Sequence, residues 1–317
     1  MNTIHKLNRS HFIQKLVLFF ILVLFFNSCS FNQKKDNSIL NVSITSKNDS
    51  LQNFQKKRNK PTLRVIVSSM ISPKETRIYY QDLFTYMSKN LDYNIEFLQR
   101  KTYKEVNDLL IDNKVDLAII CSGAYINKSA KDKIEILTVP VVDGKPFYQS
   151  FIIVNKDSKI GSFNELKDKK FAYTDPISNS GTLYAKWLVK SLGENVDTYF
   201  SKTIYTYAHD ISMQLVAKGI VDGASVDGLI FNYIKKHDPE RVKNLKIIKK
   251  SELFGIPPVV VPDNLDSELK SKLQNLFLNI HKDSLGKSIL NKISIDKFIK
   301  GKDIDYNNIR IMNSQIK

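Results

Sequence analysis

Short runs of β-branched and apolar residues alternate, along most of the chain, with stretches whose apolar residues recur at helical spacing. The pattern predicts strands at residues 63–67, 95–98 and 115–121, and helices near residues 73–91 and 103–110 between them. Parallel strands need such crossover helices. The order therefore predicts an α/β fold with a mainly parallel sheet flanked by helices.

The middle of the chain repeats this theme, and its length of 317 residues suits two lobes of roughly 100–150 residues each. An amphipathic helix is expected after a return strand that begins with a proline pair. We predict that residues 61–147 and 257–317 form lobe 1, and that residues 148–256 form lobe 2, with a hinge between them. Further strands are expected at residues 148–155, 171–174, 199–206, 221–226, 246–248 and 257–261.

The amino terminus has the pattern of a secretion signal. Residues 1–28 combine a basic segment with the uninterrupted apolar run 16–26, which is too short to span a membrane. A small residue, Ser28, then precedes Cys29, as in a bacterial lipoprotein cleavage site, although the position of the usual leucine holds Phe26. We predict lipidation at Cys29 and a flexible tether over residues 29–60. The alternative is an ordinary signal peptide.

The composition narrows the function classes. A formal charge of +16, from 48 Lys and Arg against 32 Asp and Glu, favours anionic partners. The basic residues are scattered and lack an aromatic-basic repeat, so nucleic acid is not expected as a partner. Two cysteines exclude a disulfide framework, and Cys121 is expected to be a buried small apolar residue. We expect a monomer.

Catalytic and metal motifs are missing from the sequence. It contains no Gly-x-Ser-x-Gly nucleophile turn, no Walker loop and no Gly-x-Gly-x-x-Gly after a strand. Its five histidines include no pair four residues apart. The sequence therefore predicts no enzyme activity, no catalytic residue, no metal site and no cofactor.

The strongest candidate for an anion site is the segment 174–182, which follows one predicted strand and precedes a helix. Backbone N–H groups and the helix dipole favour an anion at such a helix start. The candidate ligand-binding residues are Ser178, Asn179, Ser180, Gly181 and Thr182. The same residues would also serve as a plain helix cap, and spacing alone leaves both interpretations open.

Other strand ends offer further candidates. Ser122 could donate to a ligand oxygen and Tyr125 could wall a pocket, although the segment taken alone favours a turn with a packed tyrosine. His209 could bind an anion or cap its helix. Asp227 would repel a dianion unless it accepts a proton from the ligand or binds an amine. Residues 68–72, after the first strand, have the same ambiguity.

Several of these segments together resemble one family. Residues 175–181 read Asp-Pro-Ile-Ser-Asn-Ser-Gly and are similar to the Asp-x-x-Ser-Thr-Ser-Gly loop of the PhnD-like phosphonate-, phosphite- and phosphate-binding proteins of ABC importers. The segment from His209 to Ala224 is similar to that family's histidine segment, and residues 115–125 and 256–258 match two further parts. Asn179 stands where the family has threonine.

The resemblance implies a type II periplasmic-binding fold whose two lobes close on a small phosphorus oxyanion. It also implies an ABC permease and ATPase as partners and a location in the cell envelope, periplasmic or extracytoplasmic. Ser178, Ser180 and Gly181 match the family loop directly. Three alternatives remain: a lipoprotein that senses a ligand for a membrane partner, a secreted enzyme, or a surface adhesin on the same fold.

Overall fold

The computed structural model describes residues 42–43, 60–127, 130 and 132–316. The predicted signal peptide, Cys29 and all of the predicted tether except residues 42–43 and 60 lie outside the described residues. Among the helices that are described, none combines the length and the apolar character that crossing a membrane requires.

The first sheet has its strands in the order β1-β3-β2-β4-β13-β5-β14. β3, β2 and β4 pair in parallel, whereas β13 runs antiparallel between β4 and β5. The strands are β1 Val42–Ser43, β2 Thr62–Val67, β3 Asn94–Leu98, β4 Leu117–Ile119, β5 Ile134–Val141, β13 Val259–Pro262 and β14 Lys297–Ile299.

The second sheet has the order β11-β7-β10-β8-β9. Here β10, β8 and β9 are parallel, and β7 is antiparallel to both β10 and β11. Its strands are β7 Ser150–Asn155, β8 Lys170–Tyr173, β9 Lys202–Tyr205, β10 Gly223–Asp227 and β11 Leu245–Lys250. β6 (Phe147–Tyr148) and β12 (Phe254–Gly255) pair with each other where the chain passes between the two sheets.

The expected α/β architecture is confirmed, but both sheets are mixed and not mainly parallel. The strands β7 and β13 receive the chain as it crosses from one sheet to the other, so they enter antiparallel to their neighbours. The α-helices are α3 Pro73–Leu91, α4 Tyr103–Ile111, α5 Ser122–Tyr125, α6 Tyr184–Ser191, α7 His209–Ala217, α8 Gly228–His237, α9 Ser267–Asn279, α10 Ser284–Lys292 and α11 Asn307–Ile316.

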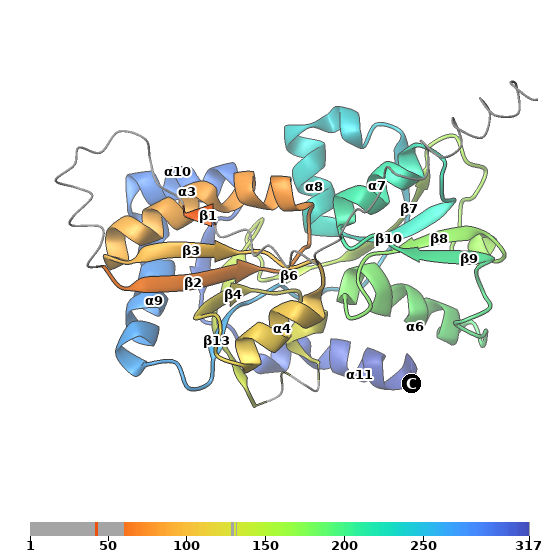
Figure 1. Cartoon of the computed structure of the whole chain (residues 1–317). Helices are drawn as coiled ribbons and strands as arrows, with labels where there is room; N and C mark the ends of the chain where they lie inside the picture. Colours follow the sequence, from red (N-terminus) through yellow and green to blue (C-terminus); the bar gives the residue numbers. More distant parts are fainter. Residues whose placement is uncertain (1–41, 44–59, 128–129, 131, 317) are drawn as a thin grey trace, which may run out of the picture. The chain divides into compact units, whose positions relative to one another are not determined.

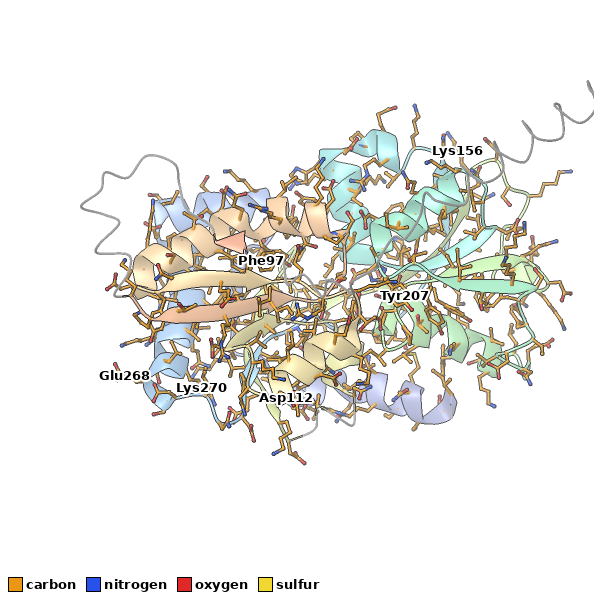
Figure 2. The ribbon with its side chains drawn as sticks, viewed as in Figure 1. Phe97, Asp112, Lys156, Tyr207, Glu268 and Lys270 are labelled. Atoms are coloured by element: carbon orange, nitrogen blue, oxygen red, sulfur yellow. The ribbon has the colours of Figure 1, made fainter. Side chains whose placement is uncertain are left out.

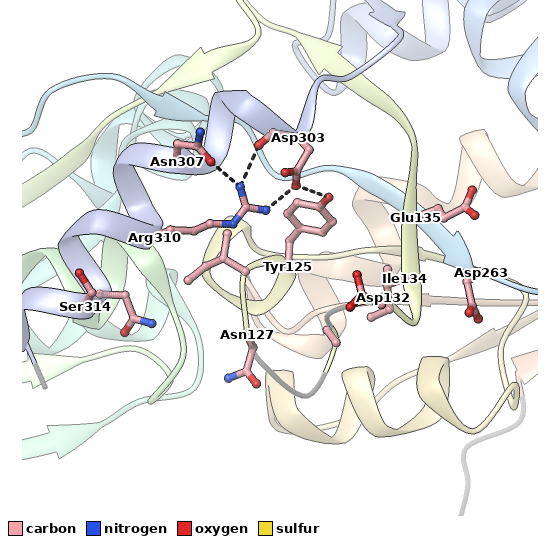
Figure 3. A pocket seen from close by; sticks show the side chains of 13 residues that line it. Tyr125, Asn127, Asp132, Ile134, Glu135, Asp263, Asp303, Asn307, Arg310 and Ser314 are labelled. Carbon is pink, nitrogen blue, oxygen red and sulfur yellow. Dashed lines mark hydrogen bonds and ion pairs between the residues drawn. The ribbon is translucent and has the colours of Figure 1, made fainter.

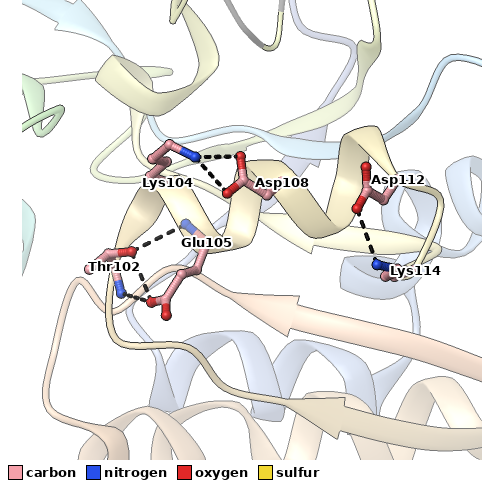
Figure 4. A network of polar contacts seen from close by, with 6 residues as sticks. All are labelled: Thr102, Lys104, Glu105, Asp108, Asp112 and Lys114. Atoms are coloured by element: carbon pink, nitrogen blue, oxygen red, sulfur yellow. Dashed lines mark hydrogen bonds and ion pairs between the residues drawn. The ribbon is translucent and has the colours of Figure 1, made fainter.

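Local sequence explains where the helices begin. α3 starts with Pro73 at its first turn, where a missing N–H is harmless. α4 starts with a capping box: Thr102 Oγ1 accepts the Glu105 N–H at 3.2 Å, and Glu105 Oε2 accepts the Thr102 N–H at 2.8 Å (Figure 4). Lys104 and Asp108 form an ion pair along the exposed side of α4. Residues 162–165, in contrast, start only the 3₁₀ turn Asn164–Leu166.

Apolar side chains form separate clusters around the two sheets. Phe97 belongs to the cluster of the first sheet, whereas the charged side chains of Lys156, Asp112 and Glu268 lie at the periphery (Figure 2). α3 packs against α9 and α10 (Figure 1), and α4 packs against β13 and α5. Burial of these apolar surfaces supplies the main stabilisation of such a fold.

The C-terminal helix belongs with the second sheet. α11 packs against α6, and Tyr306, Ile309 and Met312 join the apolar cluster that contains Phe171 and Tyr173 of β8. Since β14 is in the first sheet, the chain passes between the sheets again at residues 300–306. Chain order alone had placed residues 300–317 with lobe 1, and the packing of α11 argues for lobe 2.

Candidate functional site

The segment 174–182, here called the serine loop, leads from β8 into a helical stretch. That stretch begins with the π-helix turn Asn179–Leu183 and continues as α6. Ser178 caps it, because its Oγ accepts the Gly181 N–H at 3.1 Å. Gly181 is required by packing: a Cβ at this position would lie 2.4 Å from Thr174 Oγ1. The loop is therefore a helix start held against its own strand.

Ser180 has a fixed backbone and a free hydroxyl. Its carbonyl oxygen accepts hydrogen bonds from Ser150 Oγ at 2.7 Å and Ser225 Oγ at 2.6 Å. The Ser180 Oγ itself is buried and has no partner. Asn179 has a similar arrangement: its amide nitrogen lies 3.0 Å from Tyr148 Oη, and its Oδ1 is buried without a partner.

His209 is the first residue of α7, and its ring is held on one side only. Nδ1 lies 3.1 Å from the Asp227 backbone N and 3.0 Å from Thr174 Oγ1. Because a backbone N–H can only donate, Nδ1 is an acceptor and the ring proton is on Nε2. Burial lowers the pKa of His209 to about 3, so the ring is neutral. The buried Nε2–H has no partner.

Asp227 ends β10 and caps α8. Its Oδ1 accepts the N–H groups of Leu229 at 2.7 Å and Ile230 at 3.4 Å. Burial raises the pKa of Asp227 to about 7 despite these two hydrogen bonds. The Asp227 carboxyl therefore exchanges its proton near neutral pH.

Two donors from the first-sheet side complete the cluster. Ser68 follows β2, and its Oγ is buried without a partner. Tyr103 begins α4, its side chain is fully buried, and its hydroxyl is also unpaired. The pKa of Tyr103 is raised mainly by burial and also by the neighbouring groups Cys121, Asp175 and Asp227. The Tyr103 backbone N–H donates to Asp175 of the serine loop at 3.0 Å, which places the tyrosine beside the residues described above.

Nine buried side-chain N and O atoms in the described part of the chain lack a hydrogen-bond partner. Five of them belong to this one region, although buried polar groups are nearly always paired. We call this set the donor cluster: Ser68, Tyr103, Asn179, Ser180 and His209. Their concentration indicates a site that is completed by a polar ligand.

Two predicted ligand-binding hydroxyls are already engaged. Ser122 Oγ donates to the Gly255 carbonyl oxygen at 2.6 Å, and Thr182 Oγ1 donates to that of Asp175 at 2.7 Å. Each hydroxyl proton is therefore used within the fold. Ser122 and Thr182 support the site, but they are not free to donate to a ligand as the sequence suggested.

Tyr125 lies elsewhere, and its predicted role as a wall of the ligand pocket needs correction. Its hydroxyl donates to Asp303 Oδ1 at 2.7 Å, and Asp303 in turn pairs with Arg310 of α11 (Figure 3). Its ring packs on Tyr306 with centroids 4.8 Å apart. The ring lines a different cavity of about 920 Å³, together with residues of α11 and β5. Tyr125 is held at this cavity by contacts next to the C-terminal helix, whose position could not be inferred from the local sequence pattern.

Cys121 lies beside the serine loop, with its Sγ 3.9 Å from Ser178 Oγ. It is a free, buried thiol whose pKa is raised to about 11, mainly by burial. The expectation of a buried small apolar residue is confirmed. Among the residues that the structure describes, no group of three or more His, Cys, Asp and Glu side chains could hold a metal ion.

Two buried carboxylates from second-sheet segments cap helices that pack on the first sheet. Asp175 Oδ2 accepts the N–H of Tyr103, the first residue of α4, at 3.0 Å. Asp210 Oδ1 accepts the N–H of Ser72, directly before α3, at 2.9 Å, and its other oxygen pairs with Arg241 at 3.4 Å. Helix starts need such acceptors. Asp175 lies three residues before Ser178, the cap of the serine loop, and Asp210 directly follows His209 of the donor cluster.

Sequence reasoning missed several functional positions. Tyr103 has the spacing of a helix core residue, and Tyr148 and Ser150 fall in an ordinary strand pattern. Ser68 lies in a segment that the sequence did indicate. The only available signal for Tyr103 was its position at a helix start that follows a strand.

Comparison with known proteins gives a consistent result. Residues 65–306 match the model of a family described as ABC transporter, phosphonate, periplasmic substrate-binding protein. The phosphonates-binding periplasmic protein of Escherichia coli is 30% identical over 234 residues, covering 71% of this chain and 68% of that protein. The phosphate-import protein PhnD of Mycolicibacterium smegmatis is 28% identical over 211 residues, covering 62% and 65%.

Solved structures support the fold. A binding protein component of an ABC phosphonate transporter from Pseudomonas aeruginosa has a TM-score of 0.75 and 27% identity, covering 80% of this chain and 86% of its own. PhnD1 of Prochlorococcus marinus, in complex with methylphosphonate, has a TM-score of 0.73 and 19% identity, covering 81% and 99%. The periplasmic-binding fold expected from the sequence is confirmed.

Asp227 and His209 make opposite contributions to the pH dependence of stability. An unfolded Asp titrates near pH 3.9, so a folded pKa of about 7 lowers the free energy of unfolding as pH rises from about 4 to 7. An unfolded His titrates near pH 6.5, so a folded pKa of about 3 lowers that free energy as pH falls from about 6.5 to 3.

We expect Asp227→Asn to remove the first contribution while keeping an acceptor for the α8 cap. Without ligand, the variant should be more stable than the wild type by about 2–4 kcal/mol at pH 8, and this advantage should disappear towards pH 4. Urea unfolding at several pH values measures it. Asp108→Asn, at a partly exposed carboxylate, is the control. A stability difference that is the same at every pH would contradict the assignment.

Proposed function

Since the chain belongs to the family of periplasmic phosphonate-binding proteins of ABC transporters, we propose that its donor cluster captures a small phosphorus oxyanion: a phosphonate, phosphite or phosphate. The chain is a substrate-binding protein and not an enzyme. It would deliver the ligand to an ABC permease and its ATPase. The concentration of unpaired buried polar atoms at Ser68, Tyr103, Asn179, Ser180 and His209 is the observation that carries this proposal.

The cluster suits an oxyanion because all its donors are neutral. The hydroxyls of Ser68, Tyr103 and Ser180 and the Nε2–H of His209 can each donate to a ligand oxygen. The amide of Asn179 joins them if its Oδ1 accepts the Tyr148 hydroxyl, because its NH₂ group then faces the ligand. The helix start after Ser178 adds a favourable dipole.

Asp227 selects the protonation state of the ligand. An ionised carboxylate beside a dianion would be strongly unfavourable in a buried site. A monoprotonated oxyanion can donate its proton to Asp227, or the carboxyl itself can keep its proton near neutral pH. We therefore expect the bound complex to carry one proton more than the two separate anions.

The ligand would be enclosed by closure of two lobes about a hinge. We assign residues 61–147 and 257–299 to lobe 1, and residues 148–256 together with 300–316 to lobe 2, because α11 packs on α6. The strands β6 and β12 would form the hinge. The contacts of Asp175 and Asp210 with helix starts of the other lobe would stabilise the closed state.

Outside the described residues, Cys29 would carry the lipid that holds the protein at a membrane in the cell envelope. The following residues up to position 60 would act as a tether that lets the binding lobes reach away from the bilayer. The periplasmic location of the family is consistent with this arrangement.

Loss of one free donor should weaken ligand binding without affecting the fold. Ser180→Ala removes a hydroxyl that has no partner in the protein, so affinity for phosphate or methylphosphonate should fall by about 5- to 150-fold. Calorimetric titration measures this. Thr138→Val removes another buried unpaired hydroxyl, on β5 outside the cluster, and should leave affinity unchanged. Equal losses in both variants would argue against a ligand role for Ser180.

Asp210→Ala should weaken binding through closure alone. The variant loses the acceptor for the Ser72 N–H and the partner of Arg241, so ligand dissociation should be about 10- to 100-fold faster. Stopped-flow kinetics measures this rate. We propose that these contacts are absent from the open state, so the unliganded, open protein should keep its melting temperature. A lower melting temperature with unchanged dissociation would mean that Asp210 is only a structural residue.

Cys29→Ser should release the protein from the membrane. In a bacterial host that lipidates its lipoproteins, the wild type should fractionate with membranes and incorporate labelled palmitate, whereas the variant should do neither. Cys121→Ser, at the buried thiol, is the matched control and should fractionate like the wild type. A wild-type protein that is fully soluble would contradict the lipid anchor.

A further inference from the structure

An exposed lysine and a half-buried tyrosine meet between segments that belong to different sheets. Lys101 lies between β3 of the first sheet and α4, and Tyr207 lies between β9 of the second sheet and α7 (Figure 2). The Lys101 Nζ is 4.8 Å from the centroid of the Tyr207 ring. At this distance the negative face of a tyrosine ring attracts a cation. The contact is therefore a cation–π interaction between the two sides of the proposed cleft.

Each partner adjoins one side of the donor cluster. Lys101 lies two residues before Tyr103, and Tyr207 lies two residues before His209. The contact thus joins the segment that carries a first-sheet donor to the segment that carries a second-sheet donor. Parting the lobes to admit a ligand would separate these segments and break the contact.

The backbone of Tyr207 is in a conformation that needs support. Its φ of +60° lies in the left-handed region, which is uncommon for an aromatic residue and persists only where the surroundings hold it. The Tyr207 N–H donates to the carbonyl oxygen of Thr174, the first residue of the serine loop, at 2.7 Å. The ring also lies 6.4 Å from that of Tyr205 on β9. The position of the Tyr207 ring is therefore tied to the serine loop.

The lysine is held in a similar way on the other side. Lys101 directly precedes Thr102, which forms the capping box of α4, and the carbonyl oxygen of Arg100 accepts the hydroxyl of Ser69. Among the described residues, no carboxylate forms an ion pair with Lys101, so the ring is the partner of its ammonium group.

A second contact of the same type provides a comparison within one lobe. The Nζ of Lys186 on α6 lies 5.8 Å from the centroid of the Tyr173 ring on β8. Both residues belong to the side of the second sheet, so opening of the cleft would leave this contact intact. Lys186 is therefore a matched control for Lys101.

We propose that Lys101 and Tyr207 form a latch between the two lobes, which slows the release of the bound oxyanion. The inference rests on the proposed oxyanion function of the donor cluster and on closure of the lobes. Neither residue is a member of the donor cluster, so both are positioning residues that stabilise the closed arrangement. Since the contact forms after the ligand has entered, it should affect dissociation and not association.

Stopped-flow dissociation of methylphosphonate from the full chain tests the latch. Lys101→Met removes the charge and keeps the apolar stem, and Tyr207→Leu removes the ring. Each should release the ligand about 2- to 5-fold faster, as expected for one exposed cation–π contact. Tyr207→Phe keeps the ring, and Lys186→Met changes the contact within one lobe, so both should release it at the wild-type rate.

A double variant shows whether the two residues act through each other. Lys101→Met combined with Tyr207→Leu should release the ligand no faster than either single variant, because both changes remove the same contact. Association rates should equal that of the wild type at high salt, where long-range attraction by Lys101 is screened. A double variant whose acceleration is the product of the two single effects would overturn the latch.

The outcomes distinguish the latch from the function on which it rests. Tight binding of methylphosphonate, with the same dissociation rate in Lys101→Met and Lys186→Met, would overturn the latch and leave the oxyanion function intact. Absence of binding to every oxyanion would overturn the function itself. If Tyr207→Leu does not fold, the two lysine variants still decide, because Lys101 is exposed.

Discussion

The hydrogen bond from the Asp227 backbone N–H to Nδ1 of His209 determines the character of the whole site. It makes Nδ1 an acceptor and puts the ring proton on Nε2, which lies unpaired in the donor cluster. Burial keeps the ring neutral by lowering the His209 pKa to about 3. A protonated ring could not accept this bond, so the strand end at Asp227 and the start of α7 would lose their link. The site therefore depends on a neutral donor.

In a basic protein with a neutral binding site, the attraction of anions from a distance and the selection of one anion in the site depend on different groups. The formal charge of +16 comes from side chains that are scattered along the sequence, and such charges attract anions over a distance that salt screens. The donor cluster contains no Lys or Arg, and the ionisable groups that act on Tyr103 are Cys121, Asp175, Asp227 and Tyr148, all of them acids. Hydrogen-bond geometry and the protonation of Asp227 would therefore decide which oxyanion stays. Net charge alone predicted an anionic partner but could not identify where it binds.

The sequence predicted the elements better than the partners of their polar side chains. Alternation of strands and helices is a local signal, and the serine loop follows from a helix start after a strand. Ser122 and Thr182 have the same hydroxyl group as Ser180, but carbonyl groups of Gly255 and Asp175 occupy them. Gly255 is 133 residues from Ser122, so no local pattern reveals that bond. Long-range packing also explains why the sequence did not predict the position of Tyr125. Its hydroxyl bonds to Asp303, which pairs with Arg310 of α11, and its ring packs on Tyr306.

The positions of Asp175 and Asp210 explain how ligand capture and closure can be coupled without a long pathway. Asp175 precedes the Ser178 cap by three residues, and Asp210 follows His209 directly. In the proposed closed state, each segment would present a ligand donor and, within a few residues, an acceptor for a helix start of the other lobe. When a ligand oxygen binds the donor and orders it, the neighbouring carboxylate would already point at the N–H group of Ser72 or Tyr103 that it accepts. Such coupling requires only that the ligand stabilises the closed arrangement of the lobes more than the open one.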